Sequence, residues 1–303
     1  MKGLAPEAII AVVVVRNEAV RLPYFLEHYR KLGVGHFLFI DNGSEDGTVD
    51  YLLAQADVSL WSAKGVYRET RFGLDWATCL LAVHGHGRWC LTLDADELLI
   101  YPFHETRPLP ALTQWLEAEG RESYPAMMLD LYPEGPLGAT RYQAGQDPRA
   151  TLGWFDAGNY QISHQPETDH LWIQGGVRGR VFFAEEPRRA PTLSKIPLVK
   201  WHRRFVYVNS THSLLPPRLN RVYGESAEEA PSGLLLHTKF LDTVVEKSEE
   251  DLRRRQHFGE AEHYTGYYEQ VLQKPVLWCE ASTPLGGWRK FEALGLLSRG
   301  GWM

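Results

Sequence analysis

The apolar run AIIAVVVV at residues 8–15 constrains the fold more than any other feature of this sequence. It is rich in β-branched residues and is followed at once by the polar residues Arg16, Asn17 and Glu18. This pattern is typical of a strand that is buried on both sides in a parallel sheet. A membrane span needs about 20 apolar residues, and a secretory signal needs a basic front and a small-residue cleavage site. We therefore expect an interior strand, and neither a transmembrane nor a secretory segment.

Strand and helix patterns alternate through the first hundred residues. Strands are predicted at residues 9–15, 36–40, 58–61 and 89–93, and helices at about residues 22–32, 48–54 and 75–84. Such alternation with short connections predicts a parallel sheet with helices on both faces. Sheets of this kind bind ligands where loops leave the carboxyl ends of the strands. Three polar clusters lie at those ends, at residues 16–18, 41–43 and 94–97.

The rest of the chain has weaker patterns. We predict a helix at residues 109–118 and a strand at 126–131, then a long irregular stretch at 133–170 that we expect to be functional or mobile. Further strands are predicted at residues 177–183 and 233–236, with another regular run at 197–201. From about residue 242 the pattern becomes helical and charged.

Charge and cysteine content exclude several classes of protein. The 303-residue chain has a net charge of −6, which argues against a dedicated nucleic-acid binder that neutralises phosphates. Its 44% hydrophobic content excludes wholesale disorder. Three widely spaced cysteines without a CxxC motif exclude a disulfide framework and a cysteine-built zinc site, and they fit a reducing compartment. We expect a cytoplasmic protein.

The acidic cluster LTLDADE at residues 91–97 is the sharpest chemical signal. Side chains two positions apart on an extended segment point the same way, so Asp94 and Asp96 can converge on one ligand. Crowded carboxylates repel one another, and a hard divalent cation with oxygen ligands removes that cost. Magnesium or manganese would suit this pair and could bridge two phosphates. The alternative is an exposed acidic turn at the end of a strand.

Two further clusters add to this edge of the sheet. Asp41, at the end of the strand HFLFI, could accept hydrogen bonds from a nucleobase or ribose, whereas Ser44 or Asp46 suits a helix cap. Residues 16–18 could form a wall of the same pocket, or could simply end their strand. Neither a GxGxxG fingerprint nor a P-loop follows the first strand, so those two phosphate-binding devices are excluded.

Taken in order, VVVRNEA, DNGSEDGT and WCLTLDADELLIYP resemble the family-2-like glycosyltransferases with the GT-A fold. The later segments GGVRGRVFF, KIPLVKW, STHSLLPPRL and GLLLHTKF resemble one bacterial branch of that family, and the resemblance covers about residues 8–241. It implies an α/β fold with a mainly parallel mixed sheet flanked by helices. We expect residues 1–241 to form the GT-A domain and residues 242–303 a helical C-terminal extension.

The resemblance also implies a nucleotide-sugar donor, with a UDP-sugar favoured, and a Mn²⁺ or Mg²⁺ ion. In such enzymes the residues matching Arg16, Asn17, Glu18 and Asp41 line the nucleoside pocket. The residue matching Asp94 meets the ribose or the metal, and the residue matching Asp96 binds the metal. A late histidine often completes the metal site, and His237 is the candidate. Imidazole and carboxylates together suit manganese. The alternative for His237 is a hydrogen-bonded strand end, and His212 is a weaker second candidate.

The implied reaction is attack by an acceptor hydroxyl on the anomeric carbon, with a nucleoside diphosphate leaving. Cations stabilise the charge that develops on the leaving group, and the candidate helpers are Arg178, Arg180 and Lys239, whose alternative role is ordinary solvated charge. Inverting transfer needs a carboxylate base close to the attacking hydroxyl. The base motif of the wider family is not clear in this sequence. Asp169 is the first candidate for the base, and Asp156 and Glu167 are the alternatives.

We therefore predict a metal-dependent, inverting hexosyltransferase that acts on a glycan or glycolipid hydroxyl in bacterial surface polysaccharide or lipopolysaccharide synthesis. Arg253, Arg254 and Arg255 could touch the inner face of the cytoplasmic membrane, although a solvated helix face is the favoured interpretation of this run. The competing functions are a nucleotidyltransferase, which would normally carry a basic glycine-rich loop after the first strand, and a non-catalytic carbohydrate-binding module, which would not need the acidic pair.

Overall fold

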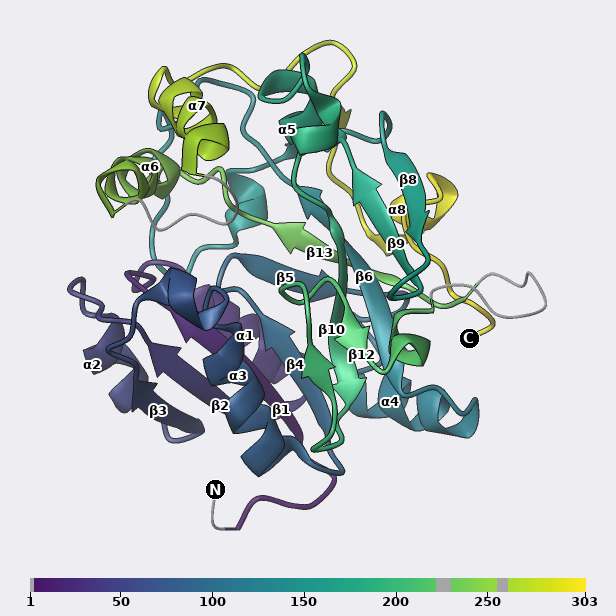
Figure 1. Ribbon diagram of the computed structural model, residues 1–303. Coiled ribbons are helices and arrows are strands. Elements are labelled where there is room, and N and C mark those ends of the chain that lie inside the picture. Colours follow the sequence, from purple (N-terminus) through teal and green to yellow (C-terminus); the bar gives the residue numbers. More distant parts are fainter. Residues whose placement is uncertain (1–2, 222–229, 255–260) are drawn as a thin grey trace.

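The computed structural model describes residues 3–221, 230–254 and 261–303. Its centre is an eight-stranded mixed sheet in the order β3-β2-β1-β4-β10-β6-β13-β5 (Figure 1). The strands of this sheet are β1 (Ile9–Val15), β2 (Val34–Asp41), β3 (Val58–Ser62), β4 (Trp89–Leu93), β5 (Glu97–Ile100), β6 (Ser123–Asp130), β10 (Ser194–Lys200) and β13 (Gly233–His237).

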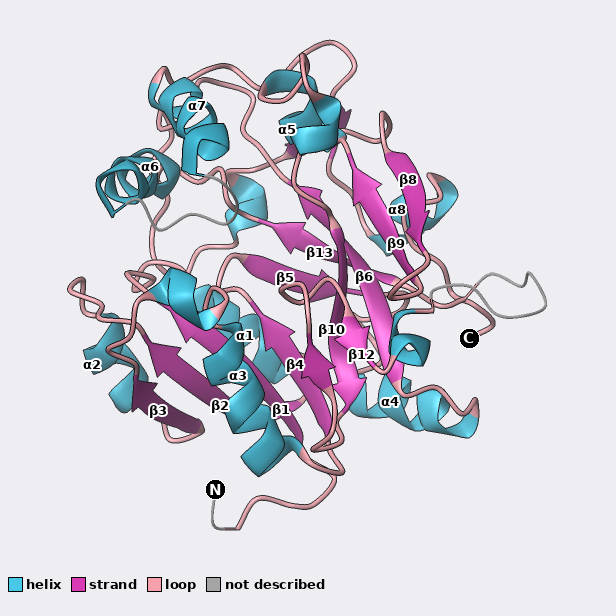
Figure 2. Ribbon diagram, viewed as in Figure 1, coloured by secondary structure: helices cyan, strands magenta, loops and turns pink. Residues whose placement is uncertain are grey.

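Helices lie on both sides of this sheet, and short ribbons lie beside it (Figure 2). The helices are α1 (Leu22–Lys31), α2 (Thr48–Leu53), α3 (Leu74–Leu80), α4 (Leu109–Ala118), α5 (Gly176–Val181), α6 (Thr243–Arg254), α7 (Ala261–Leu272) and α8 (Trp288–Ala293). The two-stranded ribbons pair β7 (Trp154–Phe155) with β14 (Thr283–Pro284), β8 (Gln161–Gln165) with β9 (His170–Gln174), and β11 (Val206–Tyr207) with β12 (Leu214–Leu215).

The apolar run that opens the chain is the buried strand β1, as predicted. It pairs in parallel with β2 and with β4, so that Val13 lies opposite Phe39 on one side and Leu93 on the other. Successive side chains of β1 enter different cores because a strand alternates its faces. Ala11 and Val13 pack in the cluster that contains α1, whereas Ile10 and Val12 pack in the cluster that contains α3.

Helix α1 shows how the sequence covers one face of the sheet. Its buried residues Leu22, Phe25, Leu26 and Tyr29 recur at the spacing that places them on one side of a helix. They pack with residues of α4 in the same core cluster. Pro23 stands in the first turn, where a missing N–H costs nothing because that N–H has no partner within the helix.

Strand β10 connects the two halves of the sheet. It runs antiparallel to both of its neighbours, with Leu198 opposite Leu91 of β4 and Lys195 opposite Ala126 of β6. Beyond it, β6 and β13 run parallel and β5 runs antiparallel to β13. The sheet is therefore mixed, and six of its strands share one direction, as expected for the predicted fold class.

The structure corrects two predictions for the middle of the chain and adds one strand. The strand predicted at residues 177–183 is the helix α5, because Gly175 and Gly176 take φ values of 132° and 61° and end the extended chain after β9. The stretch at residues 133–170, predicted to be irregular, contains β7 and β8. Residues 97–100, for which no element was predicted, form the edge strand β5, which begins at the last residue of the acidic cluster.

The C-terminal segment packs onto the core of the sheet. Val244 of α6 and Tyr267 and Val271 of α7 belong to a buried cluster that also contains Leu234 and Leu236 of β13. The helical character predicted from residue 242 is confirmed in α6, α7 and α8. The domain boundary at residue 241 stays a prediction. None of the described helices has the length and apolar character that a membrane crossing requires.

Gly233 provides a test of packing at the start of β13. A Cβ atom at this position would lie 2.6 Å from the backbone oxygen of Ile100 and 3.0 Å from the ring of Tyr124. We predict that Gly233→Ala lowers the free energy of unfolding by about 1–3 kcal/mol, because the backbone of β5 cannot yield without losing its pairing. Urea denaturation measures this value. Gly153→Ala is the control, since a Cβ there meets nothing within 4 Å, and equal stability of the two variants would contradict the prediction.

Candidate active site

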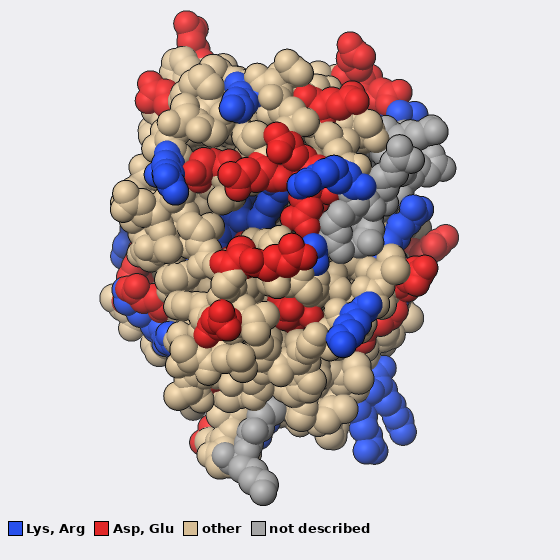
Figure 3. All heavy atoms as spheres, turned by 90° about the vertical axis from the view of Figure 1, so that its left-hand side faces the viewer, with Lys and Arg blue, Asp and Glu red and all other residues tan. Residues whose placement is uncertain are grey.

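The carboxyl ends of β1, β2, β4, β6 and β13 bring the predicted residues to one edge of the sheet. Figure 3 shows the face of the molecule on which α2 and α6 lie, with a hollow bordered above and below by acidic side chains and with basic side chains inside it. The polar residues at the strand ends fall into two groups. One surrounds Asp94 and Asp96, and the other surrounds Arg16 and Asn17.

Lys195 forms ion pairs with two residues of the acidic cluster, Asp94 and Glu97. Its ammonium group donates a hydrogen bond of 2.8 Å to Asp94 and a second, shorter one to Glu97. The side chains of Lys195 and Glu97 are 4% and 0% exposed, whereas that of Asp94 is 57% exposed. Burial raises the pKa of Glu97, and Lys195 partly offsets this effect. Asp94 is therefore bonded to a buried lysine while more than half of its side chain stays exposed.

His237 contacts the second part of the acidic cluster, Asp96. Its Nε2 atom lies 3.2 Å from Oδ2 of Asp96, and its Nδ1 atom lies 2.6 Å from Oδ1 of Asp130. Asp130 also accepts a 2.7 Å hydrogen bond from Nε of Arg178. Burial alone would lower the pKa of His237, but Asp96 and Asp130 raise it to about 9. Despite its own burial, Asp96 has a pKa well below the usual range because His237 and Arg21 stabilise its charge.

Asp96 and His237 fit a divalent cation. Within the described residues no group of three or more His, Cys, Asp or Glu side chains could hold a metal ion alone. A magnesium-type ion at a nucleotide site, however, takes only one or two carboxylates and completes its shell with phosphate oxygens and water. The 3.2 Å approach of His237 to Asp96 places two donors side by side. Metal binding would require the Nε2 proton to leave the imidazole.

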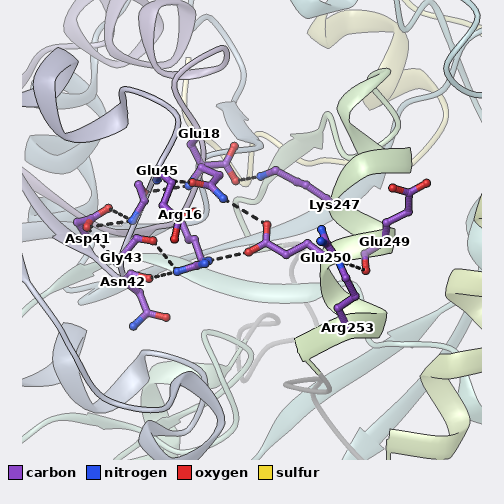
Figure 4. Close-up of polar contacts among 12 residues, drawn as sticks. Arg16, Glu18, Asp41, Asn42, Gly43, Glu45, Lys247, Glu249, Glu250 and Arg253 are labelled. Atoms are coloured by element: carbon purple, nitrogen blue, oxygen red, sulfur yellow. Dashed lines mark hydrogen bonds and ion pairs between the residues drawn. The ribbon is translucent and has the colours of Figure 1, made fainter.

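The second group joins the end of β1 to helix α6 (Figure 4). Glu250 accepts a 2.8 Å hydrogen bond from Nε of Arg16 and a 3.3 Å hydrogen bond from the amide of Asn17. One turn earlier, Lys247 forms a short ion pair with Glu18. Arg16 also donates to the carbonyl oxygens of Asn42 and Gly43, at 2.7 and 2.5 Å. Helix α6 thus lies against the end of β1, and a pocket wall formed by residues 16–18 stays a prediction.

Asp41 turns toward its own loop. Its carboxylate accepts hydrogen bonds from the backbone N–H groups of Gly43, at 3.0 Å, and Ser44, at 3.2 Å. Asp41 is 4% exposed. These bonds fix the turn after β2 and so determine where the carbonyl groups that hold Arg16 lie. The structure therefore gives Asp41 a local structural role, and contact with a nucleoside stays a prediction.

The predicted cationic helpers have partners within the protein. Arg178 pairs with Asp130, and Arg180 pairs with Asp156 at 2.8 Å and also donates to the carbonyl of Leu277. Lys239 lies over the ring of Tyr267, with Nζ 5.6 Å from the ring centroid. His212, the weaker metal candidate, is hydrogen-bonded through Nδ1 to the carbonyl oxygen of Ser194 at 2.6 Å.

The three candidate bases have other partners or are exposed. Asp169 occupies the turn between β8 and β9 and pairs with His164 and Arg221. Asp156 pairs with Arg180, and Glu167 is exposed. In the described parts of the chain, none of the three forms a hydrogen bond or ion pair with Asp94, Asp96 or His237. The assignment of the base stays a prediction.

Sequence reasoning missed Lys195, Asp130, Lys247 and Glu250. The first two carried a usable signal, because a charged residue within a largely apolar strand, as in SKIPLVK and PAMMLD, must find a partner when it is buried. Lys247 and Glu250 carried no such signal, because they stand in a helix that is charged throughout.

The pair of Lys195 and Glu97 can be tested by a double-mutant cycle. We predict that Lys195→Met lowers the free energy of unfolding by about 3–5 kcal/mol, because it leaves a buried carboxylate without its partner. The double variant Lys195→Met/Glu97→Gln should recover much of this loss, since both buried charges are gone. Urea denaturation of the wild type, both single variants and the double variant measures the coupling. Additive losses would show that the two groups do not interact.

Comparison with known proteins finds a family that resembles the first third of the chain. Residues 10–102 match the family model "Glycosyl transferase family 2". No curated protein sequence matches the chain. Ninety-seven chains of solved structures match it.

Three of these structures illustrate the level of similarity. A 4-diphosphocytidyl-2C-methyl-D-erythritol synthase is 18% identical over 46% of this chain and 66% of its own, with a TM-score of 0.28. The corresponding protein of Anaerococcus prevotii is 10% identical over 42% of this chain and 57% of its own, with a TM-score of 0.27. Glucosyl-3-phosphoglycerate synthase of Mycobacterium tuberculosis, solved with Mn²⁺ and UDP, is 19% identical over 43% of this chain and 50% of its own, with a TM-score of 0.26.

The chain spans between half and two-thirds of the length of these three proteins. The assignment to a family therefore rests on the sequence match. That match contains β1, the turn after β2 and the acidic cluster after β4, and the eight-stranded mixed sheet flanked by helices agrees with the predicted GT-A-like fold. Residues 10–102 thus match glycosyl transferase family 2, the family that the motifs in this sequence resemble.

Proposed function

We propose that this protein transfers a sugar from a nucleotide-sugar donor, with a UDP-sugar favoured, to a hydroxyl group of a glycan or glycolipid. The observation that carries the proposal is the approach of His237 to Asp96, 3.2 Å apart. Asp96 lies in the segment that matches the family-2 model, and His237 lies outside it. The residues at the end of β1, where Arg16 bonds to Glu250 and to the carbonyl oxygen of Asn42, lie at the same edge and are the proposed contacts of the nucleoside.

We further propose that Asp96 and His237, with Asp94 beside them, hold a Mn²⁺ or Mg²⁺ ion. Such an ion, when bound, supplies positive charge to the diphosphate of the donor. The chain supplies positive charge as well, because Arg21, His237 and Lys239 all stabilise the charge of Asp96 and therefore lie within its electrostatic reach. Lys195 and Lys247 extend this positive environment to Asp94 and Glu18.

In the proposed reaction the acceptor oxygen forms a bond to the anomeric carbon. The bond from that carbon to the diphosphate breaks, and its electron pair leaves with the nucleoside diphosphate. The proton of the acceptor hydroxyl passes to a carboxylate base. Asp169 remains our first candidate for this base, with inversion at the anomeric carbon, and reaching the reacting atoms would require the ion pairs of Asp169 with His164 and Arg221 to open.

We keep bacterial surface polysaccharide or lipopolysaccharide as the proposed destination of the sugar, on the resemblance of the later motifs alone. Contact with an anionic membrane was an alternative interpretation of the arginine run at residues 253–255. Arg253 is exposed on α6, and Arg255 lies outside the described residues. Membrane contact therefore receives no added support.

Asp96 provides the central test. We predict that Asp96→Ala lowers release of UDP from UDP-sugars by about a hundredfold or more, since it removes the charge that holds the metal beside the diphosphate. The rise in melting temperature that UDP with Mn²⁺ causes in the wild type should disappear. Asp96→Asn, which keeps the shape of the side chain, should behave like Asp96→Ala.

Asp75→Ala is the control for this experiment, because Asp75 forms an exposed ion pair with Arg71. Circular dichroism must show that all three variants are folded. Full sugar transfer by folded Asp96→Ala would refute the metal assignment. A wild type whose melting temperature responds to no nucleoside diphosphate would refute the proposed function as a whole.

Glu250 tests whether helix α6 belongs to the donor site. We predict that Glu250→Gln raises the KM for the donor about tenfold and leaves kcat nearly unchanged, because Arg16 and Asn17 lose the carboxylate that orients them. Steady-state kinetics with the active UDP-sugar measures both constants. Glu249→Gln is a matched control, since the neighbouring Glu249 is exposed. Equal effects of the two substitutions would contradict a specific role for Glu250.

A further inference from the structure

A cavity of about 350 Å³ is lined by the β8–β9 hairpin and by the strands β6 and β10, which follow β4 in the order of the sheet. Residues 294–298 close its far end. Figures 1 and 2 show the hairpin lying over this part of the sheet. A volume of this size is at the lower end of the range for small-molecule sites, about 300–1,000 Å³.

Lys195 connects the cavity to the acidic cluster. It forms part of the cavity wall, and its ammonium group bonds to Asp94 and Glu97. The cavity thus adjoins the carboxylate that lies next to the proposed metal position. A molecule in this cavity would lie beside the proposed donor site, which is where an acceptor has to be.

The wall of the cavity has almost no free charge. Among the described residues that line it, Lys195 alone is a lysine, arginine, aspartate or glutamate, and its charge is already matched by two carboxylates. The wall also contains His170 and His212. Burial lowers the pKa of both, to about 3 for His212, so both rings are neutral at pH 7.

The same wall offers hydrogen-bonding atoms between apolar surfaces. His170 is 6% exposed, and within the described parts of the chain its Nε2 atom has no hydrogen-bond partner. Because Nδ1 of His212 faces a carbonyl oxygen, which can only accept, that nitrogen carries the proton and Nε2 is left as an acceptor. Met127, Ile162 and Ile173 provide apolar surface. This mixture suits the hydroxyl groups and C–H faces of a sugar ring.

We propose that this cavity binds the acceptor, and that the sugar unit it holds is uncharged, a neutral hexose rather than a uronic acid or a phosphorylated sugar. The inference rests on the proposed glycosyltransferase function. Among the described residues that line the cavity, the one basic side chain that a carboxylate or phosphate would meet is Lys195, whose ammonium group already bonds to two carboxylates. Burying such a charge without a partner of its own is strongly unfavourable.

The test measures binding of methyl glycosides by saturation-transfer NMR in the presence of UDP and Mn²⁺. The neutral probes are the methyl pyranosides of glucose, galactose and mannose, and the charged probes are methyl glucuronide and glucose 6-phosphate. We expect at least one neutral probe to bind at least tenfold more tightly than either charged probe. Charged probes that bind as tightly as the neutral ones, or the absence of binding by every neutral probe, would overturn the proposal.

Two variants test whether the probes bind in this cavity. Ile162 lines the cavity with 59% of its surface exposed, so Ile162→Lys should leave the fold intact. This substitution should weaken binding of the neutral probe and strengthen binding of methyl glucuronide, each several-fold, because it adds an unmatched positive charge to the cavity wall. Leu53→Lys is the matched control, since Leu53 is 67% exposed and lies outside the cavity, and it should change neither affinity.

If Ile162→Lys keeps the wild-type ratio of affinities for neutral and charged probes, the cavity is not the acceptor site. The rise in melting temperature with UDP and Mn²⁺, measured on the same samples, separates this result from failure of the proposed function. If that rise is present and the selectivity does not change, the donor site stands and the acceptor proposal fails. If the rise is absent from the wild type, the proposed function itself fails.

Discussion

Four carboxylates converge at one edge of the sheet, and the fold has to balance their charge. Asp94 and Glu97 share Lys195, and Asp96 and Asp130 share His237. Neither Lys195 nor His237 lies on one of the first four strands. Lys195 lies on β10 and His237 on β13. The site therefore exists only when the second half of the sheet is in place.

The sequence predicted the first half of this sheet well, for a local reason. The runs in β1, β2 and β4 are apolar on both faces and each ends in a polar cluster, so both the strand and its end can be recognised from neighbouring residues. Asp94, Asp96 and His237 were predicted, and the structure brings them to one edge of the sheet. Asp96 and His237 make direct contact.

The parts of the site and of the fold that the sequence did not predict depend on contacts between residues far apart in the chain. Nothing near Asp94 indicates that Lys195 will neutralise it, and nothing near Arg16 indicates Glu250. The helix α5 was predicted as a strand because VRGRVFF alternates in the manner of one, while the deciding factor is the left-handed backbone of the two glycines before it. Arg178 was predicted as a donor-site cation, but it is held by Asp130, itself buried in β6.

The order of the strands also affects how the protein is synthesised. β4 ends at Leu93, and its partner β10 begins only at Ser194. While the ribosome makes the intervening chain, β1 to β4 can assemble, but the outer edge of β4 has no strand beside it. An open edge of this kind, formed by the fully buried residues of WCLTL, readily pairs with another chain. The nascent protein should therefore depend on chaperones during this interval, and a slow stretch of translation before residue 194 would lengthen its exposure.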